Sequence, residues 1–196
     1  LGAGAKNVVG VEYDERCLPP LEELAAAYPG RLDILAADAL ALDVSSIGTT
    51  PRRIVGNLPY NISTALLTRW LAQAHAFESM TLMFQKEVAE RLGAKPRTKA
   101  YGRLSVLTQA ICRVRKDFDL APGAFHPPPK VTSTVITLFP NTIPPACNLK
   151  TLQACTGAAF GQRRKQLRSS LRSWIQSPET LLAETDILPT SRAEEL

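Results

Sequence analysis

The chain has 196 residues, of which 45% are hydrophobic and 21% are charged. This length and composition are typical of one folded domain with a small appendage, and they exclude a disordered chain. No run of 18 apolar residues occurs, which argues against a membrane-spanning helix, and the first residues lack the pattern of a signal peptide.

Charge is divided unevenly along the chain, whose net charge is +5. Residues 1–50 hold eight acidic and three basic side chains, whereas residues 51–196 hold ten acidic and twenty basic ones. A basic excess of this size indicates a polyanionic partner for the later part of the chain, with a solvated basic face as the alternative.

The four cysteines and two histidines are scattered, and no two cysteines form a Cys-x-x-Cys pair. This pattern argues against a zinc or iron–sulfur site, and neither histidine lies in a motif typical of a nucleophilic triad. We therefore expect no metal, reduced thiols and a cytoplasmic location.

Short β-branched runs alternate with helical patterns over the first two-thirds of the chain. In chain order the pattern predicts a strand at 7–12, a helix at 19–28, strands at 32–36 and 53–56, a helix at 63–73, a strand at 79–85, helices at 86–92 and 103–111, and strands at 113–120 and 132–139. This alternation is typical of an α/β fold with a mostly parallel sheet. The last two strands follow each other without a helix, which predicts an antiparallel pair at one edge.

Three prolines and no charge between residues 140 and 148 predict a linker over 141–148. Helical patterns alone follow it, at 149–159, 163–175, 178–185 and from 191 onward. We therefore expect a larger domain over 1–140, the linker, and a small all-helical domain over 149–196.

Acidic residues lie at the ends of the first two predicted strands, Glu12 closing the first and Asp38 following the second. Ligands of doubly wound sheets bind beyond the carboxyl ends of the strands, where a carboxylate can accept hydrogen bonds from ribose hydroxyls. A role in a turn is the alternative for either residue. Gly2-Ala3-Gly4 is interpreted as a helix end and turn, because a Rossmann glycine loop needs a strand before it and an acid about 20 residues later.

The residues Asn57-Leu58-Pro59-Tyr60 directly follow the predicted strand at 53–56. The amino group of adenine is a poor nucleophile, because its lone pair is delocalised into the ring. The Asn57 side-chain oxygen and the Leu58 carbonyl can accept its two hydrogens while the lone pair turns toward an electrophile. Pro59 would stiffen the turn and Tyr60 would offer a ring for stacking, with an ordinary Asn-containing turn as the alternative.

A proline-rich segment, Phe125-His126-Pro127-Pro128-Pro129-Lys130-Val131-Thr132-Ser133, joins the last two predicted strands. A polyproline stretch is rigid and extended, so it could present Phe125 as the second jaw of a base-stacking clamp. A solvent-exposed loop is the alternative.

Six basic residues and no acidic residue lie between Lys150 and Ile175. In the helix predicted at 163–175, the four-residue spacing of Arg164, Arg168 and Arg172 would place them on one face. A basic run without counter-charges is typical of a phosphate-binding face, although most charge runs are simply solvated. The candidate RNA-binding residues are Arg163, Arg164, Lys165, Arg168 and Arg172.

Taken together, these motifs resemble the ribosomal RNA adenine N6,N6-dimethyltransferase family, of the small-subunit KsgA type, over nearly the whole chain. The resemblance rests on VEYD at 11–14, ADAL at 37–40, NLPY at 57–60, QKEVAERL at 85–92, YGRLSV at 101–106, FHPPPKVTS at 125–133 and FGQRRKQLRSSL at 160–171.

The resemblance implies a Rossmann-like sheet that binds S-adenosyl-L-methionine, followed by a helical domain that docks ribosomal RNA. The implied cofactor-binding residues are Glu12, Asp38, Ala39 and Asn57. The residues implied to hold the target adenine are Asn57, Leu58, Pro59 and Tyr60, with Phe125 stacking on the base. The implied reaction dimethylates N6 of two adjacent adenines near the 3′ end of 16S rRNA in the small ribosomal subunit, and we expect a monomer.

The family also has a strand and a glycine-rich cofactor loop ahead of the residue that corresponds to Leu1, and a further helix after Leu196. We therefore expect the first strand of the sheet to be missing, with a gap between the strands at 7–12 and 53–56. We also expect these 196 residues to bind S-adenosyl-L-methionine weakly or not at all, and to be unstable.

Two other functions remain open from the sequence. One is a related large-subunit rRNA adenine methyltransferase that confers antibiotic resistance; the segment FGQRRKQLRSSL favours the small-subunit enzyme. The other is a non-catalytic RNA-binding assembly or transcription factor of the same fold, against which the intact NLPY argues.

Overall fold

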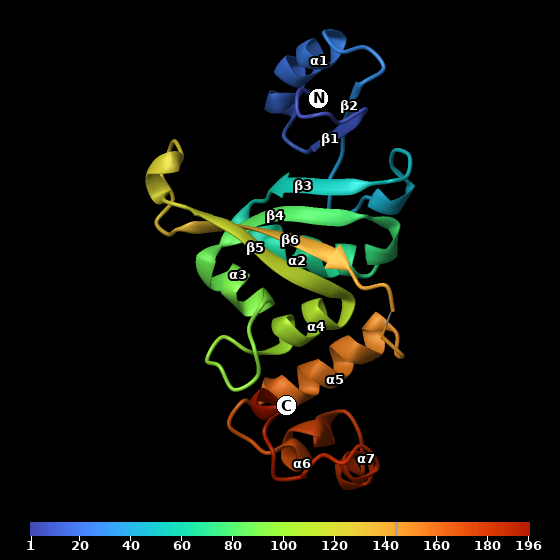
Figure 1. Ribbon diagram of the computed structural model, residues 1–196, viewed down its shortest axis with the longest axis vertical. Coiled ribbons are helices and arrows are strands. Elements are labelled where there is room, and N and C mark those ends of the chain that lie inside the picture. Colours follow the sequence, from blue (N-terminus) through green and yellow to red (C-terminus); the bar gives the residue numbers. More distant parts are fainter. Residues whose placement is uncertain (144) are drawn as a thin grey trace.

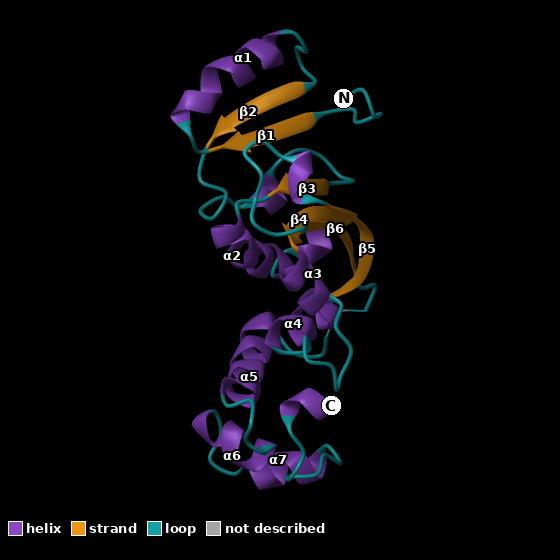
Figure 2. Cartoon of the chain, turned by 90° about the vertical axis from the view of Figure 1, so that its left-hand side faces the viewer, coloured by secondary structure: helices purple, strands orange, loops and turns teal. Residues whose placement is uncertain are grey.

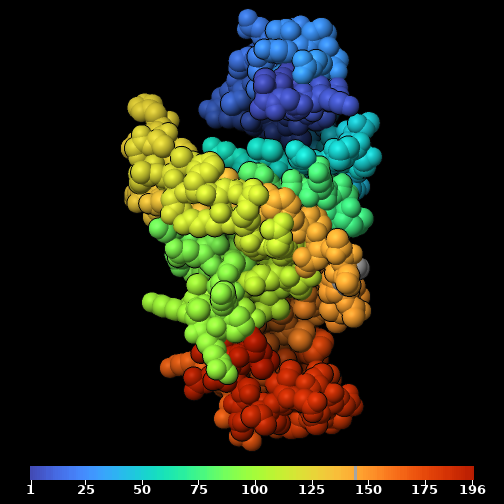
Figure 3. Space-filling view, viewed as in Figure 1, coloured from blue at the N-terminus to red at the C-terminus, as the bar shows by residue number. Residues whose placement is uncertain are grey.

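The computed structural model describes residues 1–143 and 145–196, and these form three parts along one long axis (Figure 1). A small N-terminal unit lies at one end, a four-stranded sheet with its helices lies in the middle, and short helices lie at the other end. Figure 3 shows the same order on the surface. Pro144, inside the predicted linker, lies outside the described residues.

The N-terminal unit is one strand–helix–strand crossover. The parallel strands β1 (Val8–Glu12) and β2 (Leu32–Ala36) pair along their full length. Between them lie a 3₁₀ turn, η1 (Glu15–Cys17), and α1 (Leu18–Ala26), whose first turn contains two prolines. Proline suits that position because the first helical N–H groups have no partner in the helix. Every residue of β1, α1 and β2 is at least partly exposed, so this unit has no closed core of its own.

The second sheet has the strand order β3-β4-β6-β5. Its strands are β3 (Arg53–Asn57), β4 (Ser79–Gln85), β5 (Cys112–Leu120) and β6 (Ser133–Pro140). The β3–β4 pair is parallel, whereas β4–β6 and β6–β5 are antiparallel. The predicted antiparallel pair at one edge is confirmed, but the sheet of the middle part is mixed rather than mostly parallel.

The helices α2 (Tyr60–Leu71), α3 (Lys86–Leu92) and α4 (Arg103–Ile111) pack against the second sheet (Figure 2). Their contact with β4 and β6 forms the main core, in which Leu67, Phe84, Leu92 and Leu138 are fully buried. Burying a side chain of this size contributes about 1.5–3 kcal/mol, so we expect this layer to be the most stable part of the chain.

The C-terminal part is helical and has a second apolar cluster. Helix α5 (Leu149–Gly161) begins at Asn148, whose side chain accepts a hydrogen bond from the Thr151 N–H at 2.8 Å. It packs against α4 and leads to the short elements α6 (Leu167–Ser170), η5 (Leu171–Ser173), α7 (Pro178–Glu184) and η6 (Ala193–Glu195). The buried members of this cluster are Ala159, Leu167, Leu171, Leu182 and Ala193. Further 3₁₀ turns are η2 (Val44–Ser46), η3 (Ala74–Ala76) and η4 (Pro122–Ala124).

The helix predicted over 163–175 is wrong. The chain turns after α5, with Lys165 N–H donating to the Gln162 carbonyl at 2.8 Å, and Gln166 is extended. The first N–H groups of α6 donate to the distant segment 189–191, from Leu167 to Ser191 O and from Arg168 to Pro189 O. These long-range partners replace those of a continuous helix, so Arg164, Arg168 and Arg172 do not share one helical face.

The predicted gap in the sheet is present. The strands β1–β2 and β3–β4–β6–β5 form two separate sheets, and β1 and β3 each pair on one side only. Gly2-Ala3-Gly4 lies in a turn, in which the Gly4 N–H donates to Leu1 O and Gly4 has a φ of +95°. The helix end expected beside that turn is not present among the described residues. Within the same residues, no helix combines the length and apolarity needed to cross a bilayer.

The cysteines should differ sharply in reactivity. Cys112, at the start of β5, is fully buried, and burial raises the pKa of its thiol to about 12. The thiolate is the reactive form, so Cys112 should resist alkylation at pH 8 while the exposed Cys17 and Cys147 react. Timed iodoacetamide labelling followed by peptide mass spectrometry measures this order. Labelling of Cys112 at the rate of Cys17 in folded protein would contradict the packing of β5.

Candidate active site

Glu12 and Asp38 lie at the same edge of the N-terminal unit. Glu12 ends β1 opposite Ala36 of β2, and the Ala37 N–H donates to the Glu12 carbonyl at 2.9 Å. The Glu12 Oε1 accepts from the N–H groups of Tyr13 and Asp14, both at 2.8 Å. Asp38 Oδ1 accepts from the Leu40 N–H at 2.8 Å. Each carboxylate is therefore held by its own turn, the role that the sequence left as the alternative.

These two carboxylates also fit a nucleoside. Each uses one oxygen for its turn, and no hydrogen bond within the described residues engages Glu12 Oε2 or Asp38 Oδ2. Free carboxylate oxygens at the carboxyl end of parallel strands suit the hydroxyl and amino donors of an adenosine. Ala39, which follows Asp38, is half-buried and packs against the main core.

The turn Asn57–Tyr60 connects β3 directly to α2. Asn57 is the last residue of β3, pairs with Met83 of β4, and is exposed. Leu58 is only 9% exposed and belongs to the main core. Pro59 precedes the helix with a φ of −57°, and its carbonyl accepts from the Ile62 and Ser63 N–H groups at 3.1 and 3.0 Å. The buried leucine and the capping proline hold the turn while the Asn57 side chain stays accessible.

Gly56 is a residue that the sequence reasoning missed. A Cβ at this position would lie 2.8 Å from Leu58 Cδ2 and 3.4 Å from Leu82 Cδ2. The missing side chain at residue 56 therefore leaves the space that Leu58 fills when it folds back into the core directly after the strand. Its place immediately before NLPY was the available sequence signal.

Alanine at position 56 should destabilise the protein and disturb the turn. We expect Gly56→Ala to lower the free energy of unfolding by about 1–3 kcal/mol, the usual cost of overpacking a core. Denaturant unfolding measures it, and Gly93→Ala is the matched control because its Cβ would meet Val114 at an ordinary 3.6 Å. Equal stability of the two variants would show that the Leu58 packing is not tight.

Tyr60 is tied to the start of β6. Its hydroxyl lies 2.6 Å from Ser133 Oγ, which is fully buried. Ser133 closes the proline-rich segment that carries Phe125, so this hydrogen bond joins the two halves of the predicted clamp. Ser133 is a second residue that the sequence reasoning did not assign, and its position at the end of FHPPPKVTS was its only signal.

Asp119 fixes the same end of the sheet. It accepts from Lys116 Nζ at 2.9 Å and from Thr134 Oγ1 at 2.7 Å, and Lys86 Nζ lies 3.3 Å away. The Lys116 hydrogen bond, then Thr134 and Lys86, lower the pKa of Asp119 to about 2. The carboxylate therefore stays ionised at neutral pH. It links β5, β6 and the start of α3 next to Ser133.

Phe125 lies in the loop between β5 and β6, directly after η4, and is half-buried. Figure 1 shows this loop projecting past the end of the sheet toward which β3 points. The chain bends at residues 125–127, where the sequence predicted an extended stretch. No contact between Phe125 and Tyr60 is seen among the described aromatic pairs, so the stacking role of Phe125 stays a prediction.

The predicted RNA-binding residues have different surroundings. Arg164 and Lys165 are exposed in the turn after α5. Arg172 lies 3.2 Å from Glu179, and Arg168 donates to Gln166 at 2.9 Å. Arg163 binds Glu194 at 2.7 Å. The sequence showed no acidic residue near this run, but folding brings in two carboxylates from positions 179 and 194.

The family model described as ribosomal RNA adenine dimethylase matches residues 1–196. The chain belongs to this family. A relative from Paramagnetospirillum magneticum named "Ribosomal RNA small subunit methyltransferase A" is 57% identical over 100% of this chain and 70% of its own length. One of the same name from Rhodospirillum rubrum is 53% identical over 99% of this chain and 67% of its own length.

Solved structures of similar fold support the same architecture. A dimethyladenosine transferase from Plasmodium falciparum superposes with a TM-score of 0.73 at 23% identity, covering 97% of this chain and 70% of that one. The 23S rRNA methyltransferase ErmE gives 0.68 at 24% identity, covering 98% of this chain and 78% of that one. The expected α/β, Rossmann-like methyltransferase fold is thereby confirmed.

Proposed function

We propose that the protein is an S-adenosyl-L-methionine-dependent adenine N6,N6-dimethyltransferase that acts on 16S rRNA in the small ribosomal subunit. The single observation that carries this proposal is the Asn57–Tyr60 turn, in which an exposed Asn ends a strand and a buried Leu and a capping Pro fix the backbone. Family membership and relatives named small subunit methyltransferase A support it.

When bound, S-adenosyl-L-methionine supplies a methyl group on a positively charged sulfur. Glu12, Asp38 and Ala39 would bind its adenosine part at the edge of β1–β2, and Asn57 would lie between cofactor and substrate. The chain itself needs to supply position and hydrogen bonds rather than a covalent intermediate, and such positioning alone can lower a barrier by several kcal/mol.

The residues of the turn would act on the target adenine. Asn57 Oδ1 and the Leu58 carbonyl would accept hydrogen bonds from the two N6–H groups, so that the nitrogen lone pair would face the methyl group. The amine nitrogen would take the methyl group as its bond to sulfur breaks, and it would release one proton to water. The base must first unstack, at a cost of a few kcal/mol, and stacking on Tyr60 and Phe125 at about 1–3 kcal/mol per base would offset much of it.

We assign catalysis and RNA binding to the two parts of the chain that contain the main core and the C-terminal apolar cluster. Residues 1–140 would carry catalysis, 141–148 would link the parts, and 149–196 would bind RNA, chiefly through Arg164, Lys165, Arg168 and Arg172. Because α5 packs on α4, the two parts share a contact that would hold RNA and catalytic turn in register. The proposal includes a monomer in the cytoplasm, where small subunits assemble.

The test is transfer of radiolabelled methyl groups to small subunits that lack the modification, followed by mass spectrometry of the 3′-terminal rRNA fragment. We expect dimethyladenosine at two adjacent positions of 16S rRNA. Free 23S rRNA is offered in a parallel reaction. Label in 23S rRNA and none in small subunits would favour the antibiotic-resistance enzyme, and RNA binding without label would favour the non-catalytic factor.

A further inference from the structure

The loop between α3 and α4, residues 93–102, is tied to the C-terminal part of the chain. The Arg97 N–H donates to the Glu194 carbonyl at 2.7 Å. From the other side, Arg163 Nη2 donates to the Lys99 carbonyl at 2.9 Å and to the Tyr101 carbonyl at 3.4 Å. A loop between two helices that pack on the catalytic sheet is thus anchored beside the segment predicted to bind RNA.

Arg163 holds this loop in place, and we call its hydrogen bonds the Arg163 clamp. Its Nε donates to Glu194 Oε2 at 2.7 Å while its Nη2 donates to the loop carbonyls, so two of its three guanidinium nitrogens are engaged within the protein. A guanidinium with several fixed partners has few donors left for a phosphate. Arg163 is therefore better suited to positioning the loop than to contacting RNA, unlike its neighbours Arg164 and Lys165.

The anchored loop carries positive charge that faces solvent. Lys95, Arg97 and Lys99 are exposed, and among the described residues no ion pair engages their side chains. Arg97 and Lys99 line a hollow of about 760 Å³ together with Thr98, Arg163, Glu194 and Glu195. Arg163 pairs with Glu194, so the two cations Arg97 and Lys99 outweigh the one remaining carboxylate, Glu195, whose Oε2 accepts from the Arg192 N–H.

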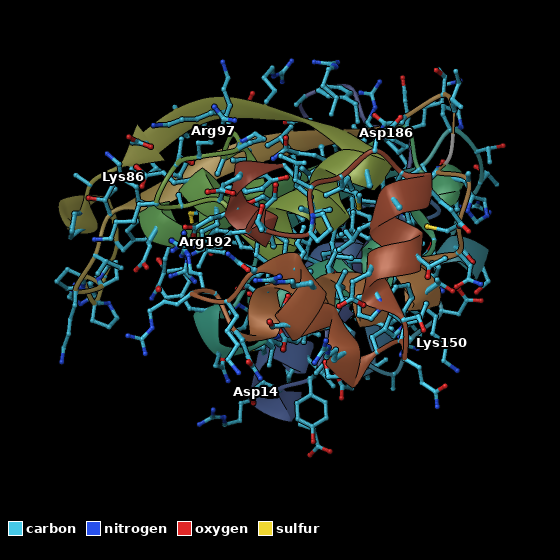
Figure 4. The ribbon with its side chains drawn as sticks, turned by 90° about the horizontal axis from the view of Figure 1, so that it is seen from below. Asp14, Lys86, Arg97, Lys150, Asp186 and Arg192 are labelled. Atoms are coloured by element: carbon cyan, nitrogen blue, oxygen red, sulfur yellow. The ribbon has the colours of Figure 1, made fainter. Side chains whose placement is uncertain are left out.

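The backbone of the loop is held in a costly conformation. Arg97 has a φ of +67°, a left-handed value that costs a non-glycine residue of order 1–3 kcal/mol. Its N–H bond to Glu194 and the Arg163 clamp hold the loop in this shape. Figure 4 shows Arg97 at the rim of the molecule, on the side away from Lys150.

We propose that Lys95, Arg97 and Lys99 form a phosphate-binding strip, continuous with Arg164 and Lys165, for the backbone of the ribosomal RNA substrate. This inference rests on the proposed function. The strip joins the α3–α4 loop to the C-terminal helices, so an RNA strand lying along it would be fixed relative to the Asn57 turn. Its contacts are to phosphates, which position RNA without reading its sequence.

The test compares two double charge reversals of equal size. Lys95→Glu/Lys99→Glu changes the strip, and Lys6→Glu/Arg113→Glu changes two exposed basic residues outside both the strip and residues 149–196. Affinity for unmethylated small subunits is measured by filter binding at several KCl concentrations. We expect the first pair to make the log–log salt slope shallower by about 1.5–2, nearly one for each lost phosphate contact, and to weaken binding at least ~10-fold near 0.1 M salt.

Equal salt slopes for the two pairs would overturn the proposal. Thermal melts verify folding, and if the reversal melts early, Lys95→Gln/Lys99→Gln gives the same readout, because the slope counts lost cations. Methyl transfer by the wild-type protein to the same particles is measured in parallel. Label with equal slopes refutes the strip alone, whereas no label from the wild type counts against the proposed function.

Discussion

Replacing Asn57 by alanine should lower the rate of methyl transfer by ~10²-fold or more while leaving RNA affinity almost unchanged. Asn57 would supply one of two acceptors for the adenine amine, and removing a preorganised hydrogen-bonding group from a transition state commonly has an effect of this size. RNA affinity comes chiefly from phosphate contacts, to which this residue would contribute little. Single-turnover rates with saturating small subunits separate the chemical step from binding.

Asn61→Ala is the matched control, since Asn61 is an exposed asparagine in the first turn of α2, four residues after Asn57. It should keep wild-type turnover. Asn57→Asp retains a side-chain acceptor and should retain more activity than alanine. Near-wild-type turnover by Asn57→Ala would show that the Asn57–Tyr60 turn does not hold the base.

Most helices and strands could be predicted from local sequence patterns. The strands at 32–36 and 79–85 and the helices at 86–92 and 103–111 match the structure to the residue. In these segments the hydrophobic period and the side of burial agree, so nearby residues decide the outcome. The helix over 163–175 failed because its N–H partners come from residues 189–191, which no local pattern reveals.

In the candidate site, too, features that depend on neighbouring residues could be predicted and features that depend on distant residues could not. The Asn57–Tyr60 turn could be predicted, because its chemistry lies in consecutive residues after a strand. The roles of Ser133 and of Glu194, the partner of Arg163, could not be predicted. Each depends on a hydrogen bond between residues more than 30 positions apart in the chain. The role of Gly56 was missed for another reason. It leaves space for Leu58, and this can be recognised only when the position of the Leu58 side chain is known.

Backbone amides of β1 and β2 should exchange with solvent at least ~10²–10³-fold faster than those of β4 and β6. Every residue of β1 and β2 is partly exposed, whereas Phe84 and Leu138 of the central strands are fully buried. Local opening free energies range from near zero for poorly packed segments to the full unfolding free energy for the core. Hydrogen exchange followed by mass spectrometry of peptides measures the difference.

The same exchange experiment tests cofactor binding by these 196 residues. β1 pairs only with β2, β3 pairs only with β4, and Val55 of β3 is 81% exposed, so the edge at which Glu12 would meet Asn57 is not closed by a common sheet. Glu12 and Asp38 would hold only the adenosine part, so S-adenosyl-L-methionine at about 0.1 mM should leave exchange in β1 and β2 nearly unchanged. A ligand at 100 times its Kd would raise the free energy of opening by about 2.7 kcal/mol, and amide exchange would then be about 100-fold slower. Slowing of that size would show that the N-terminal unit binds the cofactor tightly as it stands, and that our expectation of weak binding is wrong.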